Sequence, residues 1–472
     1  MNNKSTIKKI GFVASSNIIK LVSSILIGFV VPNILGLTNY GYYKVFVLYL
    51  TYIGLFHFGF IDGIYLKYGG VDYQELDRRK FRTYFKFLLN LEVIISIIGI
   101  IVTLLFVRDE KRFIFSLLVV NLLAINLTTY FQFISQITSR FKEYSSRIII
   151  LAFTNIIVVS YMYFAKVTDY KIYVILLVAM NYLLLIWYIV TYRDITFGKK
   201  DILSSSRKDI LSLFTIGIPL LLANLASTFV MMVDKQIVEI FFTVEKFGVY
   251  SFAYSMLAMI TVVVSAVGVV LYPILKKTNL ESIGKNYSKL NTIIISIVLI
   301  GLIGYFPLLW VIPKFLPDYI DSLIIFRIAL PGLIFTSSIT AIKLNFFKIT
   351  NKNNYFFGIS FIIILINIGL NLGAFFIFGT TVAIAISSIV GLSLWYVLTE
   401  IYMVKKHQTK WIKNSLITFI GITLFYVFSS IQNYIFSAIF YFSAIALLIL
   451  VFNRKEIKTV FDDRKRQVNG RQ

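Results

Sequence analysis

The stretch LGLTNYGYYKV, from Leu35 to Val45, is a short polar interruption between two long apolar runs. Much later the chain reads FTVEKFGVYSF, from Phe242 to Phe252, with the same aromatic-Gly-x-Tyr pattern. Three positions match at an offset of 207: Tyr40 with Phe247, Gly41 with Gly248, and Tyr43 with Tyr250. A recurrence at a fixed distance indicates an internal repeat.

The composition is that of an integral membrane protein. The 472 residues are 58% hydrophobic and only 14% charged, whereas a soluble protein has about a quarter charged. A helical span needs about 20 apolar residues, and about fourteen runs qualify: 10–31, 43–61, 84–107, 113–137, 148–165, 172–192, 212–233, 249–272, 291–313, 322–343, 355–378, 381–402, 412–430 and 433–451. These long runs predict an all-α polytopic membrane protein, because a β-barrel would show short alternating segments.

The distribution of charge predicts the topology. The apolar run after Lys4, Lys8 and Lys9 is too long for a signal peptide, so we interpret it as the first span. Most of the 46 Lys and Arg residues fall in the loops and tails on one side of the membrane, which places both termini in the cytoplasm. The net charge of +24 is therefore a topology signal and excludes nucleic acid as the partner. We interpret the basic tail 453–472 as a solvated end, with contact to anionic membrane lipid as the alternative.

The offset of 207 extends over the whole first half. It maps the spans that begin near 10, 84 and 148 onto 217, 291 and 355. We therefore expect two parallel six-helix lobes, 1–200 and 208–405, related by a pseudo-two-fold axis along the membrane normal. Two further helices at 410–452 and the basic tail follow. Parallel halves are typical of secondary transporters with a site between the lobes, and the alternative is a structural or scaffolding membrane protein.

Two regions of the chain resemble a known family. PNILGLTNYGYYKVFVLYLTYIGLFHFGFIDG, from Pro32 to Gly63, and VDKQIVEIFFTVEKFGVYSFAYSML, from Val233 to Leu257, are similar to hallmark regions of polysaccharide-unit (Wzx-type) flippases. These belong to the MATE-like multidrug/oligosaccharidyl-lipid/polysaccharide exporter superfamily. The resemblance implies a non-enzymatic flippase of the bacterial cytoplasmic membrane. Its substrate would be an undecaprenyl-pyrophosphate-linked oligosaccharide for O-antigen, capsule or exopolysaccharide. It implies no cofactor, and polysaccharide polymerase and glycosyltransferases as further partners.

Lys20 is the sharpest candidate for the substrate site. It lies about 15 Å along the first span, near the membrane midplane, where a lysine costs about 2.5–3.5 kcal/mol on insertion scales. A polar stripe at helical spacing surrounds it: Asn17, Lys20 and Ser24, with Ser16 and Ser23 alongside. The seventh span carries a counterpart: Asn224, Ser227 and Thr228. We expect the two stripes to face a central seam, where a cation suits a phosphate or pyrophosphate. The alternative is a lysine that snorkels or binds a helix carbonyl.

Other candidates carry less specific signals. Tyr43 and Tyr250 of the repeated phrase complete the predicted substrate-binding set, together with Arg327, one turn into the tenth span. Arg327 alternatively anchors locally near Asp318 and Asp321. Glu92 and His57 are candidates for ion coupling, with a buried partner for a base and a satisfied helix histidine as the alternatives.

Asp62 and Asp234 lie at the ends of predicted spans. We expect the free-energy cost of a charged side chain to be low at these positions.

Rival functions remain open at this level. A cation-coupled multidrug exporter or a lipid II flippase of the same superfamily would share the fold. Few acids lie in the spans, which favours an anionic substrate over a cationic drug. No Asp-x-Asp pair, large outer loop, metal cluster or P-loop is present in the sequence, so a membrane glycosyltransferase and an ATP-driven pump lack support. The chain has no cysteine and hence no thiol chemistry. The sugars of the unit and the driving ion are not specified by these residues.

Overall fold

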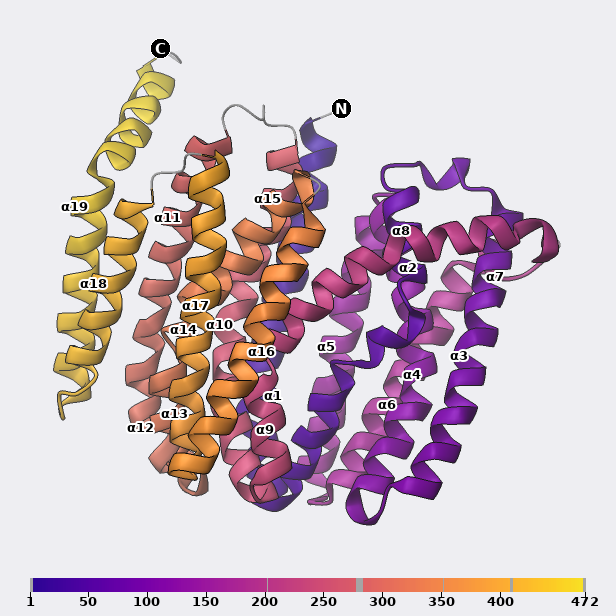
Figure 1. Cartoon of the computed structure of the whole chain (residues 1–472), viewed down its shortest axis with the longest axis horizontal. Coiled ribbons are helices and arrows are strands. Elements are labelled where there is room, and N and C mark those ends of the chain that lie inside the picture. The colour runs from indigo at the N-terminus through magenta and orange to yellow at the C-terminus, as the bar shows by residue number, and fades with distance from the viewer. Residues whose placement is uncertain (1–2, 202, 277–282, 351, 408–410, 470–472) are drawn as a thin grey trace. The chain divides into compact units, whose positions relative to one another are not determined.

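The computed structural model describes residues 3–201, 203–276, 283–350, 352–407 and 411–469, which are almost entirely helical and include no strand (Figure 1). The helices of the first half are α1 (Asn3–Leu50), η1 (Ile53–His57), α2 (Phe60–Lys67), η2 (Tyr73–Glu75), α3 (Arg78–Phe106), α4 (Asp109–Ile137), α5 (Phe141–Phe164), α6 (Tyr170–Thr191) and α7 (Arg193–Thr196). Those of the second half are α8 (Leu203–Val230), α9 (Val233–Phe241), α10 (Val244–Lys276), α11 (Ile283–Gly301), η4 (Leu302–Gly304), α12 (Tyr305–Phe315), η5 (Pro317–Tyr319), α13 (Ser322–Ala329), α14 (Gly332–Ser337), η6 (Ser338–Lys343), α15 (Leu344–Ile349), α16 (Asn353–Phe378), α17 (Thr381–His407), α18 (Ile412–Phe428) and α19 (Tyr434–Asn469).

This architecture confirms the predicted all-α polytopic membrane fold. Among the described residues, ten helices are long and apolar enough to cross a membrane, or eleven with one pair bent by 46°. The first two predicted spans, 10–31 and 43–61, are separated by a kink. Helix α1 covers the first and much of the second, but it consists of two helices that meet at Gly36, which is non-helical (φ 67°, ψ 179°). The second predicted span breaks again after Leu50.

The chain forms two compact units. The first contains residues 1–255 and 353–377, and the second contains 256–352 and 378–472. The predicted division into repeat lobes at 1–200 and 208–405 stays a prediction, as does the cytoplasmic position of the termini.

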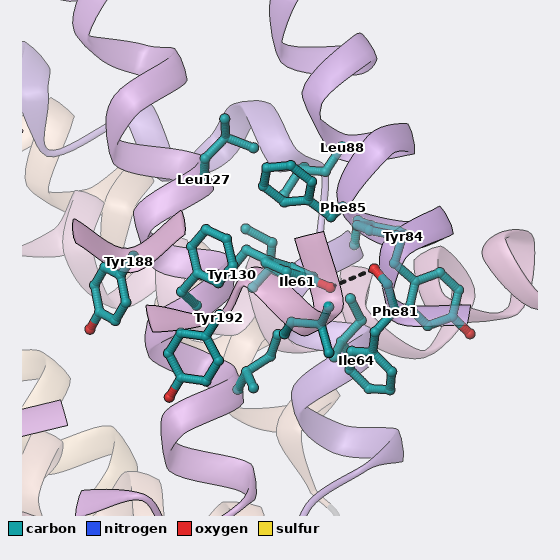
Figure 2. Packing of buried hydrophobic residues seen from close by; sticks show 14 of the residues in the cluster. Ile61, Ile64, Phe81, Tyr84, Phe85, Leu88, Leu127, Tyr130, Tyr188 and Tyr192 are labelled. Atoms are coloured by element: carbon teal, nitrogen blue, oxygen red, sulfur yellow. Dashed lines mark hydrogen bonds between the residues drawn. The ribbon is translucent and has the colours of Figure 1, made fainter. Parts of the chain in front are cut away.

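An aromatic core holds the first unit together (Figure 2). The ring of Phe131 stacks on Tyr188 and Tyr192, with centroid distances of 5.7 and 5.6 Å. The fully buried Tyr130 donates its hydroxyl hydrogen to the carbonyl oxygen of Phe81 at 2.9 Å. Buried tyrosines need such partners, so these bonds fix α3, α4 and α6 in register.

A charged cluster joins α2, α3 and α8 at one end of the first unit. The Asp209 carboxylate accepts from Lys67, from Tyr84 and from Lys80, whose Nζ lies 2.7 Å away. Because these groups come from three helices, one carboxylate fixes the start of α8 against the start of α3 and the end of α2.

Glycines let α8 cross α2 at very short range. A Cβ atom on Gly217 would lie 1.9 Å from the Gly59 carbonyl oxygen, and one on Gly63 would lie 2.0 Å from that of Leu213. Backbone therefore meets backbone here, and α8 runs obliquely across α2 (Figure 1).

In the second unit, α11, α18 and α19 meet around Leu299. A Cβ atom on Gly421 would lie 2.4 Å from the Leu299 side chain. The Tyr441 hydroxyl donates to the Leu299 carbonyl oxygen at 2.7 Å. The two helices that follow the predicted repeats thus pack on a helix of the second repeat.

Candidate functional site

The two copies of the repeated phrase touch each other. A Cβ atom on Gly41 would lie 2.2 Å from the Val244 carbonyl oxygen, and one on Gly248 would lie 3.3 Å from the Gly41 Cα. The Thr38 hydroxyl donates to the Glu245 carboxylate at 2.9 Å, and these two positions are also 207 apart. The glycines of the phrase therefore serve a close crossing of α1 and α10.

The tyrosines of the phrase have partners inside the first unit. Tyr43 packs edge-on against Tyr173, with ring centroids 4.9 Å apart. Tyr250 is buried and donates to the Asp234 carboxylate at 2.8 Å. Their predicted role in binding sugars stays a prediction.

The acids at span ends were expected to lie in an inexpensive environment, and this is wrong for Asp62 and Asp234. Each is only 4% exposed. Asp234 is stabilised there because the hydroxyls of Tyr250 and Tyr254 both donate to it, which replaces the water it has lost.

The second predicted span is broken close to its middle. Helix α1 ends at Leu50, the 3-10 turn η1 follows, and Phe58 and Gly59 then adopt left-handed conformations (φ 49° and 80°). Non-helical backbone at membrane depth needs protein or water partners. The Asn126 side chain of α4 supplies one by donating to the Ile53 carbonyl oxygen at 3.4 Å. Interrupted spans of this kind line binding sites in transporters.

Glu92 lies beside this break. Its side chain is fully buried, and the same Asn126 amide donates to its Oε1 at 3.0 Å. Its Oε2 has no hydrogen-bond partner among the described residues. Asn126 was missed by sequence reasoning, because one asparagine in an apolar helix does not reveal which carboxyl it reaches.

His57 ends the 3-10 turn. It is 5% exposed, and its Nδ1 accepts from the Gly59 backbone N–H at 3.2 Å and lies 3.8 Å from the Asp62 carboxylate. The histidine thus fixes the backbone of the break, and its predicted coupling role stays a prediction.

Lys20 lies on the exposed side of α1. Ser16 and Ser23 are buried, and Ser23 donates to the Ala152 carbonyl oxygen of α5 at 3.2 Å. Ser23 therefore attaches α1 to α5, and the role of the predicted polar stripe stays a prediction. Lys20 is exposed, and its stripe neighbours Asn17 and Ser24 are partly exposed.

A second cation acts on Lys20. Arg147, in the second turn of α5, interacts electrostatically with it. The Arg147 Nε is buried without a hydrogen-bond partner among the described residues, and the nearby titratable groups are the hydroxyls of Tyr144 and Tyr188. Arg147 was not predicted from the sequence because the predicted span begins at 148, whereas α5 begins at Phe141. No carboxylate is among the groups that act on either cation in the described part of the chain, and two cations that interact with each other favour a bound anion.

No hydrogen bond or ion pair joins the remaining predicted substrate-binding residues, Asn224, Ser227 and Arg327, to Lys20 in the described part of the chain. Asn224 is exposed, and Ser227 donates to the Ala223 carbonyl oxygen in its own helix at 3.1 Å. Arg327 binds the end of α18 through the Ser429 hydroxyl at 2.9 Å and the Tyr426 carbonyl oxygen at 3.2 Å. Their union with Lys20 in one substrate site stays a prediction.

Comparison with known proteins places the fold. No family model and no curated protein matches the chain. Among solved structures, lipid II flippase MurJ in an inward closed conformation is similar with a TM-score of 0.73 and 14% identity, over 96% of this chain and all of that one. An inward-facing multidrug resistance MATE family transporter of the MOP superfamily has a TM-score of 0.62 and 14% identity, over 83% of this chain and 98% of that one. A MOP superfamily transporter from Pyrococcus furiosus, described as having a binding pocket of reverse polarity, is similar with a TM-score of 0.61 and 12% identity. The match covers 85% of this chain and 96% of that one. This chain therefore has the fold of these transporters.

Proposed function

We propose that the chain is a flippase that moves undecaprenyl-pyrophosphate-linked oligosaccharide units across the bacterial cytoplasmic membrane by alternating access, for synthesis of a surface polysaccharide. Two lines of evidence support the proposal. The fold is shared with a lipid II flippase over 96% of the chain, and the first unit carries the Lys20 and Arg147 cations. The pair of cations is the observation that carries the proposal.

A pyrophosphate suits these two cations chemically. Lys20 is a point charge, and the planar guanidinium of Arg147 offers a fork of donors that matches phosphate oxygens. Two like charges that interact with each other are unfavourable. A diphosphate would relieve both and would give the unoccupied Nε of Arg147 an acceptor.

The break beside Glu92 supplies a second part of the proposal. In alternating access one segment must change shape, and the turn η1 already departs from helix. We assign ion coupling in the first unit to Glu92 and His57, which lie beside and within this turn.

Two alternatives have specific support. The likeness to MurJ favours a lipid II flippase, which would use the same cations. The likeness to a multidrug resistance MATE transporter favours a drug exporter, although Lys20 and Arg147 would repel a cationic drug.

A complementation experiment separates these functions. In a bacterium that lacks its glycan flippase, undecaprenyl-pyrophosphate-linked oligosaccharide is quantified at the inner leaflet after expression of each variant at equal protein level. We expect rescue by the wild type, by Lys20→Arg and by the same-helix control Lys44→Gln. We expect accumulation to persist with Lys20→Ala and Arg147→Met.

Other results would redirect the assignment. Rescue only of a strain that lacks its lipid II flippase would identify lipid II as the substrate. Altered sensitivity to cationic dyes without any change in the lipid-linked glycan would point to a drug exporter. Full rescue by Lys20→Ala and Arg147→Met would refute the cation site.

A further inference from the structure

The second unit contains a π-helical turn in the middle of a bent span. The turn η6 lies between α14 and α15, and its last residue is Lys343. A π turn holds more residues than an α-helical turn and occurs frequently at functional sites. The sequence predicted one ordinary span over 322–343, so neither the turn nor the residues that hold it were expected.

Lys343 joins this turn to α17. Its side chain is fully buried, and its ammonium group lies 3.0 Å from the Glu400 Oε2. It also donates to the Tyr396 carbonyl oxygen at 2.8 Å and to the Thr399 hydroxyl at 3.1 Å. The ammonium lies 3.6 Å from the centre of the Tyr396 ring. Its three donors thus have three acceptors, of which only one is charged.

Glu400 is less completely satisfied. It is 5% exposed, and its Oε2 accepts from Lys343 and from the Tyr287 hydroxyl of α11. Its Oε1 is buried without a hydrogen-bond partner among the described residues. Lys343 on η6, Tyr287 on α11 and Tyr396 on α17 are the titratable groups that interact with it.

More polar atoms without partners surround the pair. The Tyr396 hydroxyl faces Asn291, Ser338 and Thr418 but forms no well-aligned hydrogen bond. The Asn291 Nδ2 and the Thr418 hydroxyl are also buried without partners in the described part of the chain. Buried polar groups in proteins are satisfied by protein or by water, so this cluster is suited to hold water next to Glu400.

Stability alone does not account for the ion pair. A buried pair of charges is often no more stable than apolar side chains of the same volume. Charged groups within membrane spans are rare and mark ion or substrate pathways. A pair that joins a π turn to a neighbouring helix can act as a switch, because the loss of one charge removes the attraction between them.

We propose that the Glu400 carboxylate is a proton-binding site of the second unit and that its protonation releases the π turn from α17. A hydronium ion gives its proton to Oε1: one O–H bond of the hydronium breaks, one O–H bond forms on the carboxyl, and a neutral water remains. The net charge of the Lys343–Glu400 pair rises from zero to one. Lys343 can stay charged in this state, because two neutral acceptors and the Tyr396 ring remain around it. As a step in transport this rests on the proposed function, whereas proton binding itself does not.

Infrared difference spectroscopy on the purified full-length chain in lipid nanodiscs tests proton binding directly. On acidification the wild type should gain a carboxylic acid C=O band that is lost in Glu400→Gln. Glu239→Gln is the matched control, because Glu239 is also a buried acid bound to a lysine, with Lys111 Nζ at 2.6 Å. It should keep the band. Lys343→Met, which removes the positive charge, should show the band already at high pH.

Several outcomes would overturn the proposal. One is an identical band in the wild type and Glu400→Gln, and another is a band that changes with sodium rather than with pH. Where Glu400→Gln fails to give a folded protein, Glu400→Asp replaces it, and its band must shift in frequency. A separate experiment measures translocation of the lipid-linked glycan by the protein under an imposed proton gradient. Absence of translocation by the wild type would refute the proposed function and leave the infrared result intact.

Discussion

A methyl group added at Gly41 should weaken the crossing of α1 and α10. The added Cβ would lie 2.2 Å from the Val244 carbonyl oxygen, 2.8 Å from its side chain and 3.0 Å from its carbonyl carbon. Two of these three atoms belong to the backbone and cannot rotate away, so the helices themselves must separate.

The geometry sets the expected magnitude. Overpacking of this kind costs about 1–3 kcal/mol, and a factor of ten in a population corresponds to about 1.4 kcal/mol. The population with α1 and α10 in contact should therefore fall roughly 5-fold to 100-fold relative to the separated state. Gly248→Ala should have a smaller effect, because its Cβ would lie 3.1 Å or more from every neighbour.

The absence of cysteine from the chain makes the contact measurable. Thr38→Cys and Glu245→Cys place one thiol on each side of the crossing, where the native side chains are hydrogen-bonded at 2.9 Å. A short bis-maleimide is added to membranes, and the cross-linked peptides are quantified by mass spectrometry. Gly54→Ala is the control, because nothing lies within 4 Å of its Cβ position.

We expect Gly54→Ala to cross-link as much as the parent protein that carries Thr38→Cys and Glu245→Cys. Gly248→Ala should cross-link less, and Gly41→Ala least. Equal cross-linking of Gly41→Ala and Gly54→Ala, at equal expression and thiol reactivity, would refute the reasoning. It would mean that the contact between the repeated glycines is not required for the approach of the two helices.

Two further changes test single contacts by the thermal unfolding midpoint in detergent. Arg327→Met should lower the midpoint because it removes the hydrogen bonds to Ser429 and to the end of α18. Each bond is worth about 1.5–3 kcal/mol for a charged donor. An unchanged midpoint would mean that these bonds do not stabilise the fold and would favour the predicted substrate role of Arg327. Asn126→Leu should also lower it, by about 1–3 kcal/mol in unfolding free energy, since the buried Glu92 loses its donor. Full stability of Asn126→Leu would show that Glu92 has another partner.

Hydropathy was sufficient to predict the helices, because a backbone in lipid forms only a few structures that satisfy its hydrogen bonds. Most of each predicted apolar run lies in helix, since a chain in hydrocarbon must satisfy its own N–H and C=O groups. The break in the second span could not be seen this way. Residues 51–59 are as apolar as their neighbours, and the break depends on the left-handed Phe58 and Gly59.

The buried charges were missed for a different reason. Arg147, Lys343 and Glu400 lie at or next to the ends of the predicted spans 148–165, 322–343 and 381–402. A charge near the end of a run is ordinarily interpreted as solvated. Whether it is buried depends on partners more than 50 residues away, such as Glu400 for Lys343, and spacing along one helix cannot supply them. Lys20 could be selected from the sequence because it interrupts a long apolar run of its own helix, and its role in substrate binding stays a prediction.

The repeated phrase has a geometric explanation. Near a two-fold axis, equivalent positions contact each other, whereas elsewhere each residue meets a different part of the other copy. The contacts Gly41–Gly248 and Thr38–Glu245 both join positions 207 apart, as expected if the predicted repeat has its two-fold axis near this crossing. The close approach of backbone to backbone explains why both positions are glycine. The glycines of the pattern therefore serve helix packing, whereas the repeat itself stays a prediction.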